Sequence, residues 1–303
     1  MKPARTEQRN PRSRGLDRKS TLEILRALNR EDARVALAVR RELPKIARAV
    51  DAIVKALGSG GRLFYIGAGT SGRLAVLDAA ECPPTFGTPP RMVQAIIAGG
   101  ARALRHASEG AEDSAADGAR DLRRAGLTTN DVVVGIAASG TTPYVLGALA
   151  YARRLGAVTV GVTANPRSAV ARNAQIGVAP DTGPEAVSGS TRLKAGTAQK
   201  LVLNLLSTAS MVRLGRVYEN WMVHVALTNQ KLRRRGVRIL QEATGASASA
   251  AEHAVRQAGN DLAAALVMLK AGASAKDARH RLAAAGGNVR LALDAAKRSR
   301  TRK

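Results

Sequence analysis

A loop of small and hydroxyl-bearing residues near the start of the chain has the composition of an anion-binding loop. Residues 65–73 read YIGAGTSGR, and three of the glycines have the G-x-G-x-x-G spacing that is associated with dinucleotide binding. Thr70 and Ser71 place two hydroxyls inside this loop, where the pyrophosphate of a dinucleotide usually needs bare backbone. The loop could therefore hold either a dinucleotide or a sugar phosphate.

A second loop of the same kind lies further along the chain. Residues 138–143 read ASGTTP, and Pro143 is suited to the first turn of a helix. The backbone N–H groups at that helix start would again face a ligand, with the hydroxyls of Ser139, Thr141 and Thr142 nearby. The chain thus offers two loops that can donate hydrogen bonds to an anion.

The dinucleotide interpretation lacks one of its parts. A dinucleotide site usually has an acidic residue at the end of the second strand to bind the ribose, but residues 97–100 read IAGG. Hydroxyls combined with backbone N–H groups suit a phosphate monoester, whose terminal oxygens need partners on all sides. We therefore expect a sugar phosphate. A tight strand–helix turn without a ligand is the alternative that the glycine spacing alone leaves open.

Acidic residues between the two loops are candidates for proton transfer. Glu81 comes at the end of an expected helix, immediately before residues 82–84 (CPP), while Glu109, Glu112 and Asp113 belong to the stretch EGAEDS. Acidic residues near a helix start are ordinary partners of the helix dipole, so spacing alone does not choose among the last three. The thiol at position 82 has no histidine near it in sequence, and we interpret it as a packed small side chain.

The elements that must position these residues follow from hydrophobic patterning. Near-continuous apolar runs alternate with helical patterns, and the runs occupy residues 62–66, 92–98, 131–137, 157–163 and 175–179. This alternation predicts an α/β fold, a three-layer αβα sandwich around a mainly parallel sheet of about five strands. Both loops then lie at the carboxyl ends of strands, where open parallel sheets bind ligands.

The flanks of this α/β region are predicted to be helical. Residues 1–58 form an N-terminal segment with helices that pack on the core, residues 59–238 form the α/β domain, and residues 239–303 form a small helical C-terminal domain with a basic tail. Within the α/β domain, Pro83 and Pro84 are expected to end the helix that begins at the first loop.

Composition excludes several classes of partner. The 303 residues carry a formal net charge of +25 but only 2% aromatic residues, so the chain has basic residues without aromatics that could stack on bases, and no specific nucleic-acid partner is expected. One cysteine and the lack of a long apolar run predict a cytoplasmic protein without disulfides or membrane spans. We predict no metal and no cofactor, because the histidines lie far apart, at His106, His224, His253 and His280.

Longer motifs resemble one family. Residues 67–87 (GAGTSGRLAVLDAAECPPTFG) and 189–204 (GSTRLKAGTAQKLVLN) closely resemble the N-acetylmuramic acid 6-phosphate etherases, which belong to the sugar isomerase (SIS) domain superfamily. EGAEDS at 109–114, the second loop with its strand at 131–145, and TEQRNP at 6–11 extend the likeness over nearly the whole chain. The resemblance implies an SIS fold and a metal-independent lyase that removes D-lactate from N-acetylmuramate 6-phosphate.

The resemblance also implies roles for individual residues. The catalytic glutamates of the family match Glu81 and Glu112, as the acid that protonates the departing lactate and the base that takes the C2 proton. The expected substrate-binding residues are Gly69, Thr70, Ser71, Gly72, Ser139, Gly140, Thr141, Thr142, Ser190 and Lys194. Ser190 belongs to a third polar loop, at residues 188–191, and Lys194 follows it. This loop could hold the lactyl carboxylate or the phosphate, or it could only cap the next helix.

One position departs from the family pattern, and one alternative function stays open. The family usually has arginine where this chain has Thr141, so a charge contribution from the second loop is in doubt. SIS proteins commonly pair, so we expect a homodimer. The alternative is a sugar-phosphate sensor without catalysis, which would need the phosphate loops but neither Glu81 nor Glu112.

Overall fold

The computed structural model of the protein describes residues 4–106 and 108–300. The chain divides into two compact units. The first comprises Met1–Ala80 and Pro90–Thr208, and the second comprises Glu81–Pro89 and Ala209–Lys303.

A five-stranded parallel sheet forms the centre of the first unit. Its strands are β1 (Leu63–Gly67), β2 (Val93–Ile97), β3 (Val132–Ile136), β4 (Val158–Val162) and β5 (Ile176–Val178). They lie in the order β2-β1-β3-β4-β5, and every neighbouring pair is parallel. All five predicted strands are confirmed to within a residue or two at their ends. The order reverses at β1, which has β2 on one side and β3 on the other.

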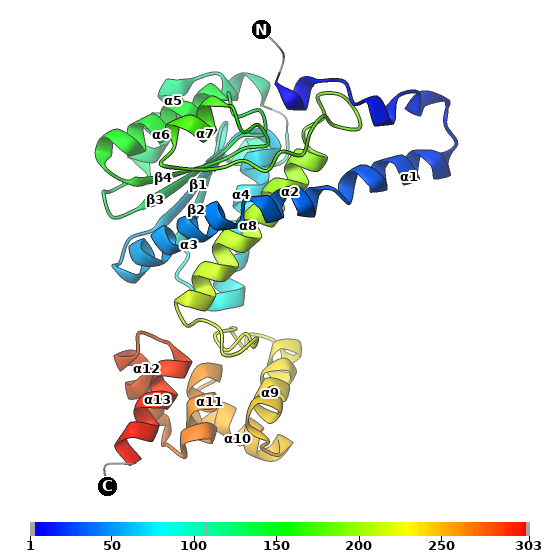
Figure 1. Ribbon diagram of the computed structural model, residues 1–303. Coiled ribbons are helices and arrows are strands. Elements are labelled where there is room, and N and C mark those ends of the chain that lie inside the picture. Colours follow the sequence, from blue (N-terminus) through cyan, green and yellow to red (C-terminus); the bar gives the residue numbers. More distant parts are fainter. Residues whose placement is uncertain (1–3, 107, 301–303) are drawn as a thin grey trace. The chain divides into compact units, whose positions relative to one another are not determined.

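Helices cover both faces of this sheet, as the apolar strands predict (Figure 1). One face carries α5 (Ala115–Arg124), α6 (Pro143–Leu155) and α7 (Ala169–Asn173), and the other carries α3 (Leu43–Gly58), α4 (Gly69–Phe86) and α8 (Lys194–Arg213). Buried Phe64, Ile66 and Val133 pack against Leu122 and Tyr144 of the first helix layer. The three-layer αβα architecture is therefore confirmed.

The helix after the first loop does not end at the double proline, so that prediction is wrong. α4 continues through Pro83 and Pro84 to Phe86. A proline backbone has a φ near −65°, which a helix accepts, and its cost is the missing N–H donor to the carbonyl four residues earlier. In the last turn this removes only two hydrogen bonds. The carbonyl of Pro83 still accepts a hydrogen bond from the N–H of Gly87, at 2.9 Å.

The N-terminal segment of the first unit is built from short helices. It contains η1 (Arg5–Glu7), η2 (Pro11–Ser13), η3 (Leu16–Arg18), α1 (Thr21–Asp32) and α2 (Val35–Arg41). Ser20 and Glu23 form the capping box that starts α1, in which Glu23 accepts hydrogen bonds from the backbone N–H and the hydroxyl of Ser20. The η1 and η2 turns carry the TEQRNP stretch.

The second unit is a set of helices with its own hydrophobic core. Its helices are α9 (Gln230–Thr244), α10 (Ala248–Gln257), α11 (Leu262–Ala271), α12 (Ala275–Ala284) and α13 (Val289–Arg300). The stretch before α9 belongs to this unit, because Val223, Val225 and Leu227 are buried in the same core as Leu240 and Leu266. In the structure the two units divide between Thr208 and Ala209, within the C-terminal part of α8, whereas the boundary expected from the sequence follows residue 238.

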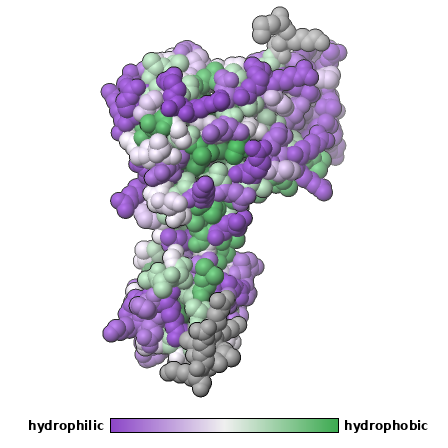
Figure 2. Space-filling model, turned by 60° about the vertical axis from the view of Figure 1, so that its left-hand side comes forward, coloured by the Kyte–Doolittle hydropathy of each residue, from purple (hydrophilic) through white to green (hydrophobic). Residues whose placement is uncertain are grey.

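The visible surface is mainly hydrophilic (Figure 2). Figure 2 shows hydrophilic residues over most of the visible surface, with smaller hydrophobic areas between them. Among the described residues, no helix combines the length and apolar character needed to cross a membrane.

Candidate functional site

The first loop joins β1 to α4 in the geometry of an anion site. Gly69 has φ +52°, in the left-handed region that favours glycine. Gly72 lies so close to the second strand that a Cβ there would come within 2.5 Å of the Ile97 side chain. This turn brings the chain directly from the strand into the helix, whose first N–H groups have no intrahelical acceptor. The positive end of the α4 dipole and these N–H groups are suited to bind an anion.

The second loop joins β3 to α6 beside the first. Pro143 occupies the first turn of α6, as predicted. Gly140 has φ +71°, and the hydroxyls of Ser139 and Thr141 are hydrogen-bonded to each other at 2.9 Å. Because β1 and β3 are neighbours at the point where the strand order reverses, the two loops diverge around a crevice. Open α/β sheets bind their ligands at such switch points.

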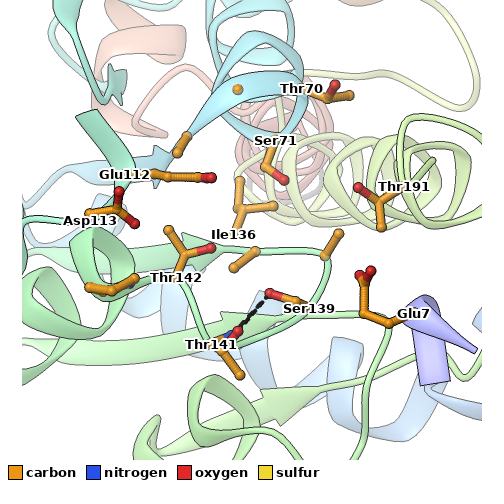
Figure 3. Close-up of a pocket in the computed structure, with 15 residues that line it drawn as sticks. Glu7, Thr70, Ser71, Glu112, Asp113, Ile136, Ser139, Thr141, Thr142 and Thr191 are labelled. Atoms are coloured by element: carbon orange, nitrogen blue, oxygen red, sulfur yellow. Dashed lines mark hydrogen bonds between the residues drawn. The ribbon is translucent and has the colours of Figure 1, made fainter. Parts of the chain in front are cut away.

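A pocket of about 410 Å³ occupies this crevice, and its polar lining comes from five parts of the chain. The polar residues that line it are Glu7, Thr70, Ser71, Glu112, Asp113, Ser139, Thr141, Thr142 and Thr191. Figure 3 shows Glu112 and Asp113 on one side, Glu7 and Thr191 on the other, and the hydroxyls of the two loops between them. None of the described residues that line this pocket is Lys, Arg or His. An anion bound here would be held by hydroxyls, N–H groups and helix dipoles.

Glu112 and Asp113 reach the pocket from a short turn ahead of α5. Glu112 ends η5 (Glu109–Glu112), and Asp113 is its C-cap. Ser114 is the N-cap of α5, and its hydroxyl accepts a hydrogen bond from the N–H of Asp117. Asp117 is therefore the acidic residue in the first turn of α5, whereas Glu112 and Asp113 precede the helix and face the pocket. The side chain of Glu109 lies outside the described part of the structure.

Ser71 connects the pocket to a buried polar network between α4 and α8. Its hydroxyl donates a hydrogen bond to Oε1 of Gln199 at 3.0 Å, which fixes the side chain. About two helical turns further along α4, Asp78 accepts a hydrogen bond from the hydroxyl of Ser207 on α8, at 3.2 Å. Burial raises the pKa of Asp78, although hydrogen bonds from Ser207 and Tyr65 act in the opposite direction. This network holds α4 and α8 together beneath the first loop.

Other predicted site residues lie elsewhere. Gly72 and Gly140 shape the two loops without lining the pocket, and Ser190 also lies outside its lining. Glu81 is exposed, near the C-terminal end of α4, in the part of that helix that belongs to the second unit. The pocket of the first unit thus contains Gly69, the five predicted hydroxyl-bearing residues of the two loops, and Glu112.

Lys194 lies in a buried ion pair. Its side chain is 2% exposed, and Nζ donates a hydrogen bond to Oε2 of Glu31 at 2.5 Å. The same carboxylate oxygen accepts a hydrogen bond from Asn10 at 2.8 Å. Burial by itself raises the pKa of Glu31, but the hydrogen bonds from Lys194 and Asn10 outweigh it, so that its pKa lies below the ordinary value. The ammonium of Lys194 therefore has a carboxylate of the protein itself as its partner.

The start of α8 is also capped by the protein. The N–H groups of Lys194 and Ala195 donate hydrogen bonds to the two carboxylate oxygens of Glu185, at 3.0 and 2.9 Å. Glu185 is fully buried. The first N–H groups of α8 therefore bind a carboxylate of the chain itself, whereas the first N–H groups of α4 face the pocket.

Replacing Lys194 by Met is expected to lower the free energy of unfolding by about 3–5 kcal/mol, because the buried Glu31 carboxylate loses its cation. Chemical denaturation measures the change, with Lys45→Met as the control, since Lys45 forms an exposed pair with Glu42. The pKa of Glu31 is lower in the folded than in the unfolded chain, so its contribution is present at neutral pH and is lost as the pH falls through the lowered value. An unchanged stability with a raised KM would instead make Lys194 a ligand contact.

Two polar lining residues, Thr191 and Glu7, are not among the site residues that the sequence predicts. Thr191 belongs to the third polar loop, next to the predicted Ser190, and it faces the pocket. Glu7 lies in the TEQRNP stretch, which carried the family resemblance but no predicted role. Spacing could not have found Glu7, because the contact depends on how residues 4–13 fold against the sheet.

Comparison with known proteins finds relatives over most of the chain. The chain is 57% identical over 266 residues to the N-acetylmuramic acid 6-phosphate etherase of Serratia proteamaculans (strain 568), covering 88% of this chain and 90% of that protein. It is 57% identical over 264 residues to the protein of the same name from Yersinia pestis (strain Pestoides F), covering 87% and 90%. Residues 45–153 match the family described as the glucokinase regulatory protein N-terminal SIS domain.

Solved structures show the same fold at much lower identity. A candidate phosphosugar isomerase involved in capsule formation, from Bacteroides fragilis NCTC 9343, superposes with a TM-score of 0.50 and 19% identity, covering 66% of this chain and 95% of that chain. This likeness confirms the architecture of the first unit.

Proposed function

Because this chain belongs to the N-acetylmuramic acid 6-phosphate etherases, we propose that it is a carbon–oxygen lyase that cleaves the D-lactyl ether of N-acetylmuramate 6-phosphate. The products are N-acetylglucosamine 6-phosphate and D-lactate, as in the recycling of cell-wall amino sugars. The observation that carries the proposal is 57% identity over 88% of the chain, with 90% of the relative covered.

The pocket is suited to such a substrate. The N–H groups at the start of α4 and the hydroxyls of Thr70, Ser139 and Thr142 can donate hydrogen bonds to phosphate oxygens. The carboxylates on either side can accept hydrogen bonds from sugar hydroxyls and can exchange protons with carbon and oxygen. Its volume of about 410 Å³ lies within the usual range for small-molecule sites.

The first half of the reaction is an elimination. In the open-chain aldehyde form of the sugar, the carbonyl group acidifies the proton on C2, and Glu112 takes that proton. The electron pair of the C2–H bond first passes into the aldehyde as an enolate, and it then forms the C2–C3 double bond as the bond between C3 and the lactyl oxygen breaks. Glu81, in its protonated form, gives a proton to the departing lactyl oxygen. Lactate and an unsaturated aldehyde result.

The second half is the addition of water. Glu81 is now a carboxylate and takes a proton from the water that attacks C3. Glu112 carries the proton it removed and returns it to C2. Both carboxyl groups are thereby restored to their starting protonation states, and the net reaction consumes one water molecule. The aldehyde of the substrate supplies the acidity of the C2 proton, which is why these roles need only an acid, a base and an anchor for the phosphate.

We also infer a homodimer in the cytoplasm. Large apolar side chains are exposed on the N-terminal helices of the first unit, at Leu22, Leu25, Leu37 and Leu43, each more than 40% exposed. A second copy that covers them would remove this apolar area from water. The chain has a single cysteine, the buried Cys82, which cannot form a disulfide within the chain, and this suits a reducing compartment.

The purified protein is expected to release D-lactate from N-acetylmuramate 6-phosphate, measured with a lactate-specific coupled assay. The reaction should need no added metal or nucleotide, and N-acetylmuramate without phosphate should react far more slowly because it lacks the anchor. Light scattering of the same sample is expected to give twice the chain mass. Tight binding of the sugar phosphate without lactate release would overturn the proposed activity and favour a sensor.

A further inference from the structure

The N-terminal segment contributes a carboxylate to the pocket that the reaction scheme does not use. Glu7 ends η1 and lines the pocket together with residues that follow β1 and β3. In Figure 3 its side chain extends into the pocket from the side opposite Glu112, next to Thr191 and Ser139. Thr6 donates a hydrogen bond to this carboxylate, with 3.3 Å between Oγ1 and Oε1.

Buried contacts hold the segment on both sides of Glu7. Thr6 is fully buried and Asn10 is 2% exposed. The amide of Asn10 donates to Oε2 of Glu31 at 2.8 Å and to the carbonyl of Pro184 at 3.1 Å, so it joins the buried Lys194 pair. Arg5 forms an ion pair with Asp181 at 2.8 Å. These anchors fix the backbone at Glu7 against the α/β core and keep its side chain at the pocket.

The chemistry of a carboxylate limits what Glu7 can bind. An ionised carboxylate accepts hydrogen bonds and cannot donate them, and a phosphate group is likewise an acceptor. Glu7 is therefore unsuited to the phosphate, for which the two loops supply donors. A hydroxyl group of a sugar is a suitable partner, since it can donate to Glu7 while the phosphate stays in the loops.

From this placement we propose that Glu7 is a substrate-binding residue that accepts a hydrogen bond from a hydroxyl group of the sugar. The inference rests on the proposed function, because it takes the ligand to be a hexose phosphate. It assigns the TEQRNP segment as one wall of the pocket, opposite the wall that carries Glu112. The segment then orients the carbon chain while the loops hold the phosphate.

The direction in which binding of the sugar phosphate changes when the Glu7 carboxylate is removed separates a hydrogen bond from charge repulsion. Glu7, Glu112 and Asp113 place three carboxylates around a pocket whose described lining has no basic side chain. If Glu7 had no partner on the ligand, its charge would only repel the phosphate, and removing the charge would strengthen binding. If Glu7 holds a hydroxyl, removing the carboxylate weakens binding of the sugar phosphate.

The test uses Glu7→Gln and Glu7→Ala, with Asp17→Asn as a matched control because Asp17 is an exposed acid of the same segment outside the pocket lining. Dissociation constants are measured by calorimetry for N-acetylglucosamine 6-phosphate and for inorganic phosphate, together with kcat and KM for lactate release. We expect Glu7→Ala to raise the Kd of the sugar phosphate and the KM by roughly 10- to 100-fold, as for a lost hydrogen bond to a charged group. Glu7→Gln should raise both by a smaller factor.

Inorganic phosphate has no hydroxyl chain, so its binding should be unchanged or tighter in both variants, and Asp17→Asn should behave as the wild type. Equal or tighter binding of the sugar phosphate in Glu7→Ala would overturn the assignment. The two proposals fail separately. If the wild type releases no lactate but its sugar-phosphate binding depends on Glu7, only the etherase activity is refuted. If lactate release is normal and indifferent to Glu7, only the Glu7 assignment is refuted.

Discussion

Glu112→Gln is expected to lower the rate of lactate release by about 10²- to 10⁴-fold, the usual loss when a general base is removed. Glutamine keeps the shape of the side chain but cannot take the C2 proton. The measurement is kcat at saturating N-acetylmuramate 6-phosphate. The fold should be preserved, because Glu112 is exposed and precedes Ser114, which caps α5 independently of it.

The neighbouring carboxylate supplies the control for this variant. Asp113 also lines the pocket, so Asp113→Asn removes the same charge at nearly the same place. We expect a far smaller loss from Asp113→Asn if proton abstraction belongs to Glu112. A second readout is exchange of the C2 proton in deuterated water, which should disappear in Glu112→Gln. A near-normal rate or normal exchange in that variant would remove Glu112 from the mechanism.

The sheet and its ligand-binding edge could be predicted from the sequence because their causes are local. Short apolar runs rich in Val, such as residues 131–137, are typical of strands buried on both faces, and glycine at position 69 favours a left-handed turn. Hydroxyls at the ends of neighbouring strands must then meet at one edge of the sheet. For the same reason the sequence alone predicts Ser139 and Thr70 as substrate-binding residues.

The remaining features depend on contacts between distant parts of the chain. The pairing of Lys194 with Glu31 joins residues that are 163 positions apart, and nothing in the sequence around either one indicates it. A basic residue next to a polar loop has the same local pattern whether it binds a ligand or a buried carboxylate. Glu7 is a similar case, since this exposed acid in a terminal segment reaches the pocket through contacts that its neighbours Arg5 and Asn10 make with distant parts of the chain.

In α4, too, a local sequence signal predicts the wrong structure. A double proline is a strong stop signal for a helix, yet the helix continues through both prolines to Phe86. Proline is costly in a helix interior because a carbonyl loses its donor, and near the end of a helix this cost concerns few bonds. Glu81 consequently lies on a regular helical turn, and its direction is set by the helix and not by a rigid loop.

Glu81→Gln is expected to stop lactate release to a similar degree, about 10²- to 10⁴-fold, because the lactyl oxygen then leaves without a proton donor. The effect of Glu81→Gln on exchange of the C2 proton should differ from that of Glu112→Gln. Abstraction of the C2 proton does not require Glu81, so exchange of this proton in deuterated water should persist while lactate stays bound to the sugar. Leu77→Ala, a change at an exposed position of the same helix, serves as the control.

Co-expression of the two variants tests whether the two glutamates of one site come from the same chain. In the proposed homodimer, co-expression of Glu81→Gln and Glu112→Gln chains at equal levels makes half of the dimers mixed. If the two glutamates of one site come from different copies, each mixed dimer has one intact site, and activity returns to roughly a quarter of the wild-type value. If both come from one chain, every site carries a defect and the mixture stays inactive. Either result keeps both glutamates in the reaction, whereas a near-normal rate for Glu81→Gln alone would exclude it as the acid.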